Sequence, residues 1–181
     1  MNEISDKEIL DQFFNGDKNK SFSLLLKKYQ ERLYWHIRKI VISHENTDDV
    51  LQNTFLKVWK YLYNFKQESS LYTWLYRVAT NEALAYIKKN KPEYHLPISD
   101  NESEFKDKLA DDNFFTGDEI ALKLQTAINT LPEKQKLIFN MKYFDEMKYS
   151  EISEILETSV GALKASYHIA VKKIEAFLKN D

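Results

Sequence analysis

Apolar side chains recur at helical spacing through the first half of the chain and predict four helices there. The expected helices span residues 5–16, 22–41, 47–62 and 70–87. Ser5 and Glu8 have the spacing of a capping box, and Gly16 suits a C-terminal cap. Thr47 and Ser70 are expected to cap the third and fourth helices through their hydroxyls. The expected inward-facing residues are Ile9, Leu10, Phe13, Phe14, Phe22, Leu25, Leu26, Tyr29, Leu33, Ile37, Ile40, Val41, Val50, Leu51, Thr54, Phe55, Val58, Trp59, Leu62, Leu71, Leu75, Val78, Ala79 and Ile87.

The second half of the chain predicts four shorter helices, over residues 118–131, 132–144, 150–156 and 159–178. Asp118 and Ser159 suit N-caps, Pro132 suits a first turn, and Ser150 opens the third of these helices. A short helix, a turn of about three residues and a longer helix form a helix-turn-helix pattern, which can place a helix in the major groove. Many small helical bundles contain such a pair without binding DNA. The expected inward-facing residues are Ile120, Leu124, Ala127, Ile128, Leu131, Leu137, Ile138, Met141, Phe144, Ile152, Ile155, Leu156, Val160, Leu163, Tyr167, Ala170, Val171, Ile174 and Leu178.

The helical spacing predicts an all-α fold, and the charge distribution indicates two domains separated by an acidic segment. Residues 1–90 hold 14 basic and 11 acidic side chains, residues 91–119 hold 3 and 9, and residues 120–181 hold 9 and 8. The acidic middle piece also contains Pro92 and Pro97 and lacks sustained periodicity. We expect two small helical domains, at residues 1–90 and 118–181, joined by an acidic linker at residues 91–117.

Composition narrows the class of protein further. With 43% hydrophobic residues and no cysteine, the chain is typical of a folded protein of the reducing cytoplasm. No stretch has the roughly 20 apolar residues of a membrane span, and the N-terminus does not resemble a signal peptide. The four histidines show no metal-ligand spacing, and no glycine-rich phosphate loop is present. We therefore expect no catalytic residue, metal or cofactor.

Aromatic residues crowd around the polar break at residues 64–70, in greater number than two buried stripes need. They alternate with cationic side chains, a pattern that suits single-stranded nucleic acid because rings stack on bases and cations contact phosphates. The alternative is an aromatic core with a solvated basic face. The aromatic residues are Tyr61, Tyr63, Phe65, Tyr72, Trp74 and Tyr76, and the cations are Lys57, Lys60, Lys66, Arg77, Lys88 and Lys89.

Two blocks of this sequence resemble a known family. DDVLQNTFLKVW at residues 48–59, FKQESS at 65–70 and YTWLYRVATN at 72–81 resemble the core of a bacterial sigma factor of the extracytoplasmic-function (ECF) type. The pair LP at 131–132, YSEI at 149–152 and SVGALKASYHIA at 159–170 resemble the DNA-binding domain of the same family. The resemblance implies sigma domain 2-like and domain 4-like folds, binding to core RNA polymerase, promoter recognition, and an anti-sigma factor as partner.

The resemblance implies that the third helix docks on the clamp helices of the largest polymerase subunit. The implied contacts are Asp49, Gln52, Asn53 and Phe55. Asn53 departs from the glutamate usual in the family, so an amide replaces one charge there. The alternative reading of Asp48 and Asp49 is helix capping alone.

The loop at residues 65–70 resembles the loop that captures a flipped base of the minus-ten element, with Phe65 covering the face of the base. The implied minus-ten residues are Phe65, Lys66, Gln67, Glu68 and Ser70 in the loop and Trp74, Arg77 and Asn81 on the helix that follows. The helical spacing places the last three on one surface, while Trp74 fits the core equally well.

The last helix is expected to read the minus-35 duplex. The implied residues are Ser159, Ala162, Lys164, Ala165, Ser166, His168, Ile169 and Lys172. Ser166 and Ile169 stand where the family usually has arginine, which predicts a less G-rich element read through thymine methyls. The linker is implied to pass toward the polymerase active centre; a solvated tether is the alternative. A stand-alone helix-turn-helix regulator with an N-terminal sensing or dimerising domain is the competing function.

Overall fold

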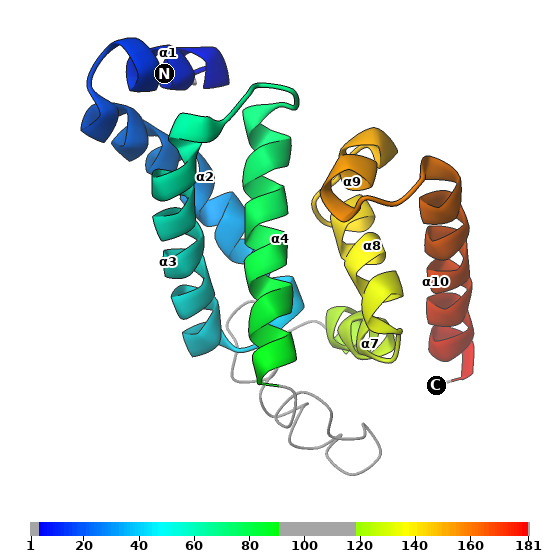
Figure 1. The fold of residues 1–181 in the computed structure, drawn as a ribbon. Coiled ribbons are helices and arrows are strands. Elements are labelled where there is room, and N and C mark those ends of the chain that lie inside the picture. Colours follow the sequence, from blue (N-terminus) through cyan, green and yellow to red (C-terminus); the bar gives the residue numbers. More distant parts are fainter. Residues whose placement is uncertain (1–3, 91–118, 181) are drawn as a thin grey trace. The chain divides into compact units, whose positions relative to one another are not determined.

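The computed structural model describes residues 4–90 and 119–180, and among these residues it contains helices and no strand (Figure 1). The all-α prediction is confirmed. The N-terminal helices are α1 (Asp6–Asn15), α2 (Lys18–Val41), α3 (His44–Tyr61), the 3₁₀ turn η1 (Leu62–Asn64) and α4 (Leu71–Lys89). The C-terminal helices are α7 (Glu119–Asn129), α8 (Glu133–Tyr143), α9 (Tyr149–Leu156) and α10 (Val160–Asn180). The helices fall into two compact units, and the predicted linker at 91–117 and the Asp118 cap lie outside the described residues.

Several helix ends follow the capping pattern of the sequence. Ser5 and Glu8 form a complete capping box, in which the Glu8 N–H donates to Ser5 Oγ at 3.2 Å and the Ser5 N–H donates to Glu8 Oε2 at 2.7 Å. The Ser5 hydroxyl also donates to Glu8 Oε2 at 2.7 Å, and this hydrogen bond, followed by that from the Ser5 N–H, lowers the pKa of Glu8. The Gly16 N–H closes α1 onto the Gln12 carbonyl, and Ser70 Oγ accepts the Thr73 N–H at 3.0 Å.

The start of α3 corrects the sequence prediction. Ser43, not Thr47, is the N-cap, and α3 begins at His44. Thr47 is buried and its hydroxyl donates to the Ser43 carbonyl at 2.6 Å, which satisfies that hydroxyl inside the first turn. Asp48 and Asp49 consequently lie beyond the first turn, whose acidic residue is Glu45. Capping therefore does not explain the Asp48–Asp49 pair.

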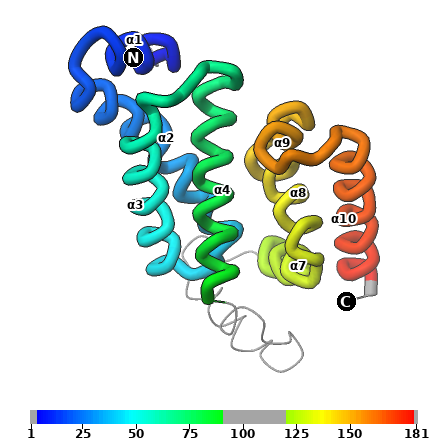
Figure 2. The backbone as a smooth tube through the Cα atoms, in the orientation of Figure 1, coloured from blue at the N-terminus to red at the C-terminus, as the bar shows by residue number. Residues whose placement is uncertain are grey.

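Helix α2 forms the centre of the N-terminal unit and packs against α1, α3 and α4 (Figure 2). Its stripe of Leu25, Tyr29, Leu33 and Ile37 is almost wholly buried, as the hydrophobic spacing predicts. Phe14 and Trp59 were expected inside, but they are 41% and 42% exposed. Both rings still contact the edge of the core, because each forms an edge-to-face pair with Phe13.

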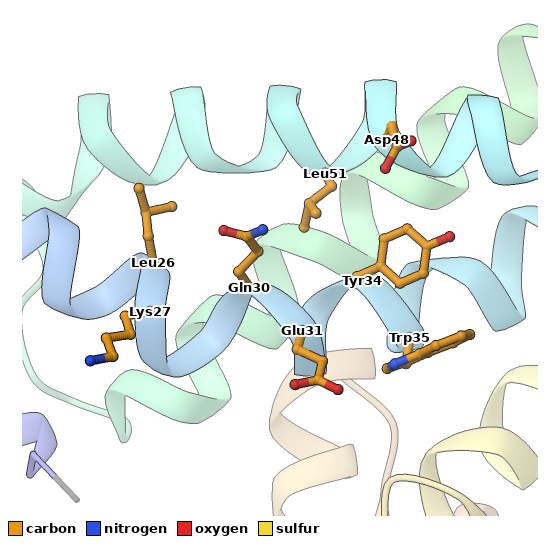
Figure 3. Close-up of a pocket in the computed structure, with 8 residues that line it drawn as sticks. All are labelled: Leu26, Lys27, Gln30, Glu31, Tyr34, Trp35, Asp48 and Leu51. Atoms are coloured by element: carbon orange, nitrogen blue, oxygen red, sulfur yellow. The ribbon is translucent and has the colours of Figure 1, made fainter.

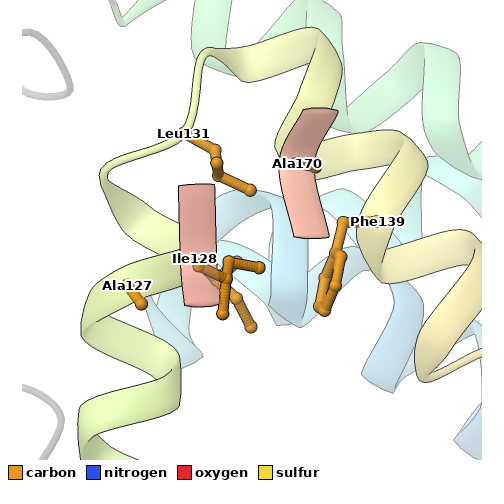
Figure 4. Packing of buried hydrophobic residues seen from close by; sticks show 6 residues of the cluster. Ala127, Ile128, Leu131, Phe139 and Ala170 are labelled. Atoms are coloured by element: carbon orange, nitrogen blue, oxygen red, sulfur yellow. The ribbon is translucent and has the colours of Figure 1, made fainter. Parts of the chain in front are cut away.

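The core of the C-terminal unit joins α7, α8 and α10. Ala127, Ile128, Leu131, Phe139, Ala170 and Ile174 form its buried cluster (Figure 4). Phe139 was absent from the predicted core but is 4% exposed, and Phe177, not Leu178, packs against the cluster from α10. The apolar side chains predicted to be inside but found exposed lie at or next to helix ends, where neighbouring helices cover less surface: Ile120, Phe144, Val160 and Leu178.

Two helix starts in this unit are shifted by one residue from their predicted positions. Pro132 is the N-cap of α8 and lies outside its first turn. Helix α9 begins at Tyr149, one residue before Ser150, because the Ile152 N–H already donates to the Lys148 carbonyl at 3.0 Å.

Candidate nucleic-acid interface

Helix α3 presents a polar face made by residues one turn apart. Asp49, Gln52 and Asn53 are all exposed and lie at i, i+3 and i+4, so their side chains share one side of the helix. Phe55 is half-buried and turns toward α2, where its ring meets the edge of Phe22 with centroids 6.4 Å apart. Leu56, which the sequence analysis did not select, is 61% exposed and adds an apolar side chain one turn further along the same side of the helix.

A groove of about 510 Å³ runs beside this face, between α2 and α3 (Figure 3). Its lining includes Leu26 and Leu51 between the helices, with Gln30 and Tyr34 from α2 and Asp48 from α3. Sequence reasoning missed the α2 side of this groove, because the residues of α2 that reach it carry no recognisable motif.

The loop between η1 and α4 is shaped by backbone and aromatic contacts. Gln67 has a positive φ of 58°, an uncommon conformation for a residue with a side chain. Phe65 is only 8% exposed; its N–H donates to the Leu62 carbonyl at 3.0 Å. The Phe65 ring packs on Trp74 with centroids 5.3 Å apart. Lys66, Gln67, Glu68 and Ser70 are exposed, so the polar part of the predicted loop site faces outward.

Helix α4 carries the remaining predicted minus-ten residues. Leu71 and Leu75 are buried, Asn81 is exposed, and Trp74 and Arg77 are half-buried. The Trp74 ring supports Phe65, and part of its surface stays accessible. The expectation that some of the crowded aromatic residues are exposed is confirmed at Tyr61 and Tyr63.

Helix α10 carries the predicted duplex-reading residues on its outer side. Ser159 caps it by accepting the Ala162 N–H at 3.3 Å. The exposed residues of this set are Ser159, Ala162, Lys164, Ala165, His168, Ile169 and Lys172, and Ser166 is half-buried. Because Leu163, Ala170 and Ile174 anchor the opposite side, the outer face is small and apolar with lysines at its edges.

Two lysines from different helices meet one ring at the start of α9. The Lys142 ammonium lies 5.4 Å and the Lys164 ammonium 5.8 Å from the centre of the Tyr149 ring. Lys142 is further fixed because its Nζ donates to the Met147 carbonyl at 3.0 Å. These contacts hold positive charge next to the helix-turn-helix. Sequence reasoning could not find them, because Lys142, Tyr149 and Lys164 lie on three different helices.

Within residues 4–90 and 119–180, no group of three or more histidine, cysteine or acidic side chains could hold a metal ion. Over the same residues, none of the helices is both long and apolar enough to span a bilayer.

Comparison with known proteins finds two family models that match separate parts of the chain. The model of sigma-70 region 2 matches residues 25–93, and the model of sigma-70 region 4 matches residues 121–174. The RNA polymerase sigma-H factor of Pseudomonas aeruginosa is 27% identical over 187 aligned positions, covering 99% of this chain and 96% of that protein. The ECF RNA polymerase sigma factor SigW of Bacillus subtilis is 27% identical and covers 92% of each chain.

Solved structures share the fold at lower identity. CnrH, solved in complex with the cytosolic domain of CnrY, is 20% identical with a TM-score of 0.71, over 97% of this chain and 98% of that one. The sigma factor RpoE of Bartonella quintana, solved with the anti-sigma factor NepR, is 22% identical with a TM-score of 0.71, over 90% of this chain and 99% of that one. The chain belongs to the sigma-70 family as an ECF sigma factor, a protein that directs promoter-specific initiation of transcription.

Proposed function

We propose that this sigma factor divides promoter recognition between three surfaces. Helix α3 binds core RNA polymerase, the loop at residues 65–70 with α4 captures the melted minus-ten strand, and α10 reads the minus-35 duplex. The observation that carries this proposal is that most of the proposed contact residues at all three places are exposed, while the opposite sides of α3, α4 and α10 are buried. The corresponding domains are residues 1–90 and 118–181, with an acidic linker at residues 91–117.

The polymerase contact is proposed for Asp49, Gln52 and Asn53, with Phe55 at its edge. The carboxylate of Asp49 lies outside the first turn of α3 and is exposed, so it remains available to a cationic partner. The clamp helices of the largest polymerase subunit are the proposed partner surface. The neighbouring groove offers a place for an apolar side chain of the same partner.

The minus-ten contact is proposed for the loop residues Lys66, Gln67, Glu68 and Ser70. A flipped base is read along its polar edge, and these exposed amide, hydroxyl and charged groups supply donors and acceptors. Phe65 shapes the loop by packing on Trp74. Arg77 and Asn81 of α4 complete the proposed contact with the opened strand.

The minus-35 contact is proposed for the outer face of α10. Ala162, Ala165 and Ile169 offer apolar surface to thymine methyls. Lys164, His168 and Lys172 are placed to contact phosphates, and Ser159 and Ser166 contribute hydroxyls. The absence of arginine at positions 166 and 169 predicts a minus-35 element that is poorer in guanine than the family norm.

The proposed cellular role follows from these partners. The protein acts with RNA polymerase in the cytoplasm and catalyses no reaction itself. CnrH and RpoE were each solved with another protein, the cytosolic domain of CnrY and the anti-sigma factor NepR. We propose that an anti-sigma factor likewise binds this chain.

Run-off transcription with core RNA polymerase on genomic fragments tests the proposal. The wild-type protein is expected to give defined start sites. The Asp49→Ala, Gln52→Ala double variant is expected to bind core polymerase at least ~10-fold more weakly, at about 1 kcal/mol for each lost contact. Its unfolding temperature should be unchanged, because both side chains are exposed.

The Asp11→Ala variant is the matched control, since it removes an exposed carboxylate from α1. If the double variant bound core polymerase with wild-type affinity, the proposed polymerase contact of α3 would be wrong. Tight promoter binding by the free protein, without any effect on transcription by core polymerase, would instead favour the stand-alone regulator.

A further inference from the structure

The ring expected to cover an unpaired base is not at the surface. Phe65 is 8% exposed, and its ring packs against the Trp74 ring with the centroids 5.3 Å apart. A base that leaves the stack needs an aromatic or apolar surface on its face as well as polar partners on its edge. Another ring near the loop must therefore supply the stacking surface.

Tyr63 is the most exposed aromatic side chain in the described part of the chain, at 69%. It lies in η1, the short 3₁₀ turn that leads from α3 into the loop. Its neighbour Leu62 is fully buried and anchors this turn in the core. The backbone that carries Tyr63 is therefore held in place while its ring stays in solvent.

The position of Tyr63 along the chain brings it to the loop. Phe65 lies two positions further along the chain, so the Cα atoms of the two residues lie at most about 7 Å apart. Cationic side chains lie on both sides of it in sequence: Lys66 is exposed in the loop, and the Lys60 ammonium lies 5.5 Å from the centre of the Tyr61 ring. An exposed ring flanked by cations is the combination that binds single-stranded nucleic acid.

We propose that Tyr63 is the stacking residue for an unpaired base of the melted minus-ten strand. This inference rests on the proposed function, because it assigns a further residue to the same DNA contact. The phenol ring covers the face of a base, the loop residues contact its edge or that of its neighbour, and Lys60 and Lys66 lie near the phosphates. Phe65 acts indirectly, by supporting Trp74 and the loop backbone.

The experiment measures binding of the reconstituted holoenzyme to a fluorescent single-stranded oligonucleotide that carries the minus-ten sequence of a promoter mapped by run-off. Tyr63→Ala is expected to weaken binding about 5- to 150-fold, the range for loss of one stacked base. Tyr63→Phe keeps the ring and is expected to bind within twofold of wild type. Phe14→Ala, which removes a 41% exposed ring from α1, is the matched control and is expected to leave binding unchanged.

Thermal unfolding and core binding separate this role from a structural one. Tyr63→Ala should keep the wild-type unfolding temperature and core affinity, whereas Phe65→Ala should lower the unfolding temperature because its ring is buried. Wild-type oligonucleotide affinity in Tyr63→Ala, or a loss of affinity that follows weaker core binding or unfolding, would overturn the inference. Failure of the wild-type protein to direct initiation at any promoter would overturn the proposed function itself.

Discussion

Tyr29 is a buried side chain of α2 that ties α1 to the rest of the N-terminal unit. It is 2% exposed, and its hydroxyl donates to Asp6 Oδ1 at 2.7 Å. Lys28 Nζ donates to the same carboxylate oxygen at 2.8 Å. Burial, followed by the hydrogen bond to Asp6, raises the pKa of Tyr29 well above its ordinary value. The folded protein therefore keeps this phenol protonated at pH values where the unfolded chain loses the proton.

Replacing Tyr29 by Phe tests this arrangement. The variant loses one buried hydrogen bond and should be less stable by about 1 kcal/mol at pH 8. Because the folded-state pKa is raised, the contribution of Tyr29 is complete below about pH 10 and is lost as the pH rises above that value. Urea unfolding between pH 8 and 11.5 should show the wild type losing stability faster than Tyr29→Phe above pH 10. Parallel pH profiles for the two proteins would contradict this explanation.

Residue types near the loop were predictable, but their exposure was not. The sequence predicted an aromatic cluster around residues 64–70 with some exposed rings, and Tyr61 and Tyr63 are exposed. Sequence spacing could not decide that Phe65 is buried, because a loop has no periodicity to assign its faces. Phe65 is buried because its ring packs against Trp74.

At the scale of elements, the connection between α8 and α9 carries a locally strained residue. Glu146 has a positive φ of 52°, its side chain is exposed, and it follows Asp145, whose N–H donates to the Asn140 carbonyl at 3.1 Å. A residue with a Cβ is disfavoured in this left-handed conformation, whereas glycine adopts it freely.

Glu146→Gly is accordingly expected to stabilise the protein by about 0.5 kcal/mol, because relief of the left-handed strain exceeds the extra backbone entropy of glycine. Glu68→Gly is the matched control: it changes an exposed loop glutamate that is not among the described residues with positive φ, and it should be neutral or destabilising. Chemical denaturation of both variants and the wild type measures the difference. Equal destabilisation by the two substitutions would show that no strain is stored at Glu146.

Helix existence was far more predictable than helix ends. The capping box at Ser5 and the caps at Ser70 and Ser159 all follow the sequence. Thr47 does not, because Ser43 lies four residues earlier with an equally good hydroxyl and the buried Thr47 side chain bonds back to its carbonyl. Where two hydroxyl residues could each cap a helix, the one whose hydroxyl the core does not bury becomes the N-cap.

At the scale of the whole molecule, the proposed function assigns separate parts of promoter recognition to the two units, so their specificities should change independently. Ile169 is 45% exposed on the proposed duplex-reading face of α10. Ile169→Arg introduces a side chain able to donate two hydrogen bonds to guanine, worth about 1–3 kcal/mol of discrimination. Holoenzyme with this variant should select more G-rich minus-35 elements from a promoter library while its minus-ten preference stays unchanged.

The same substitution at Ile120, which is 75% exposed on α7, is the control for added positive charge. Ile120→Arg should strengthen binding to all sequences slightly or not at all. A shift in minus-ten preference caused by Ile169→Arg would contradict the separation of the two recognition surfaces.

The sequence by itself determined the all-α fold class, the α-helices in the part of the chain that the structure describes, and most of the buried stripes, because these depend on local spacing. It also determined the family, because the family motifs are contiguous in the chain. Only the tertiary structure decided which of several suitable side chains is covered. It placed Phe139 and Phe177 in the core, left Trp59 partly exposed, buried Phe65 beside Trp74, and gathered Lys142 and Lys164 at Tyr149. The physical reason is that burial and ion–ring contacts arise between different elements, whereas periodicity describes one helix at a time.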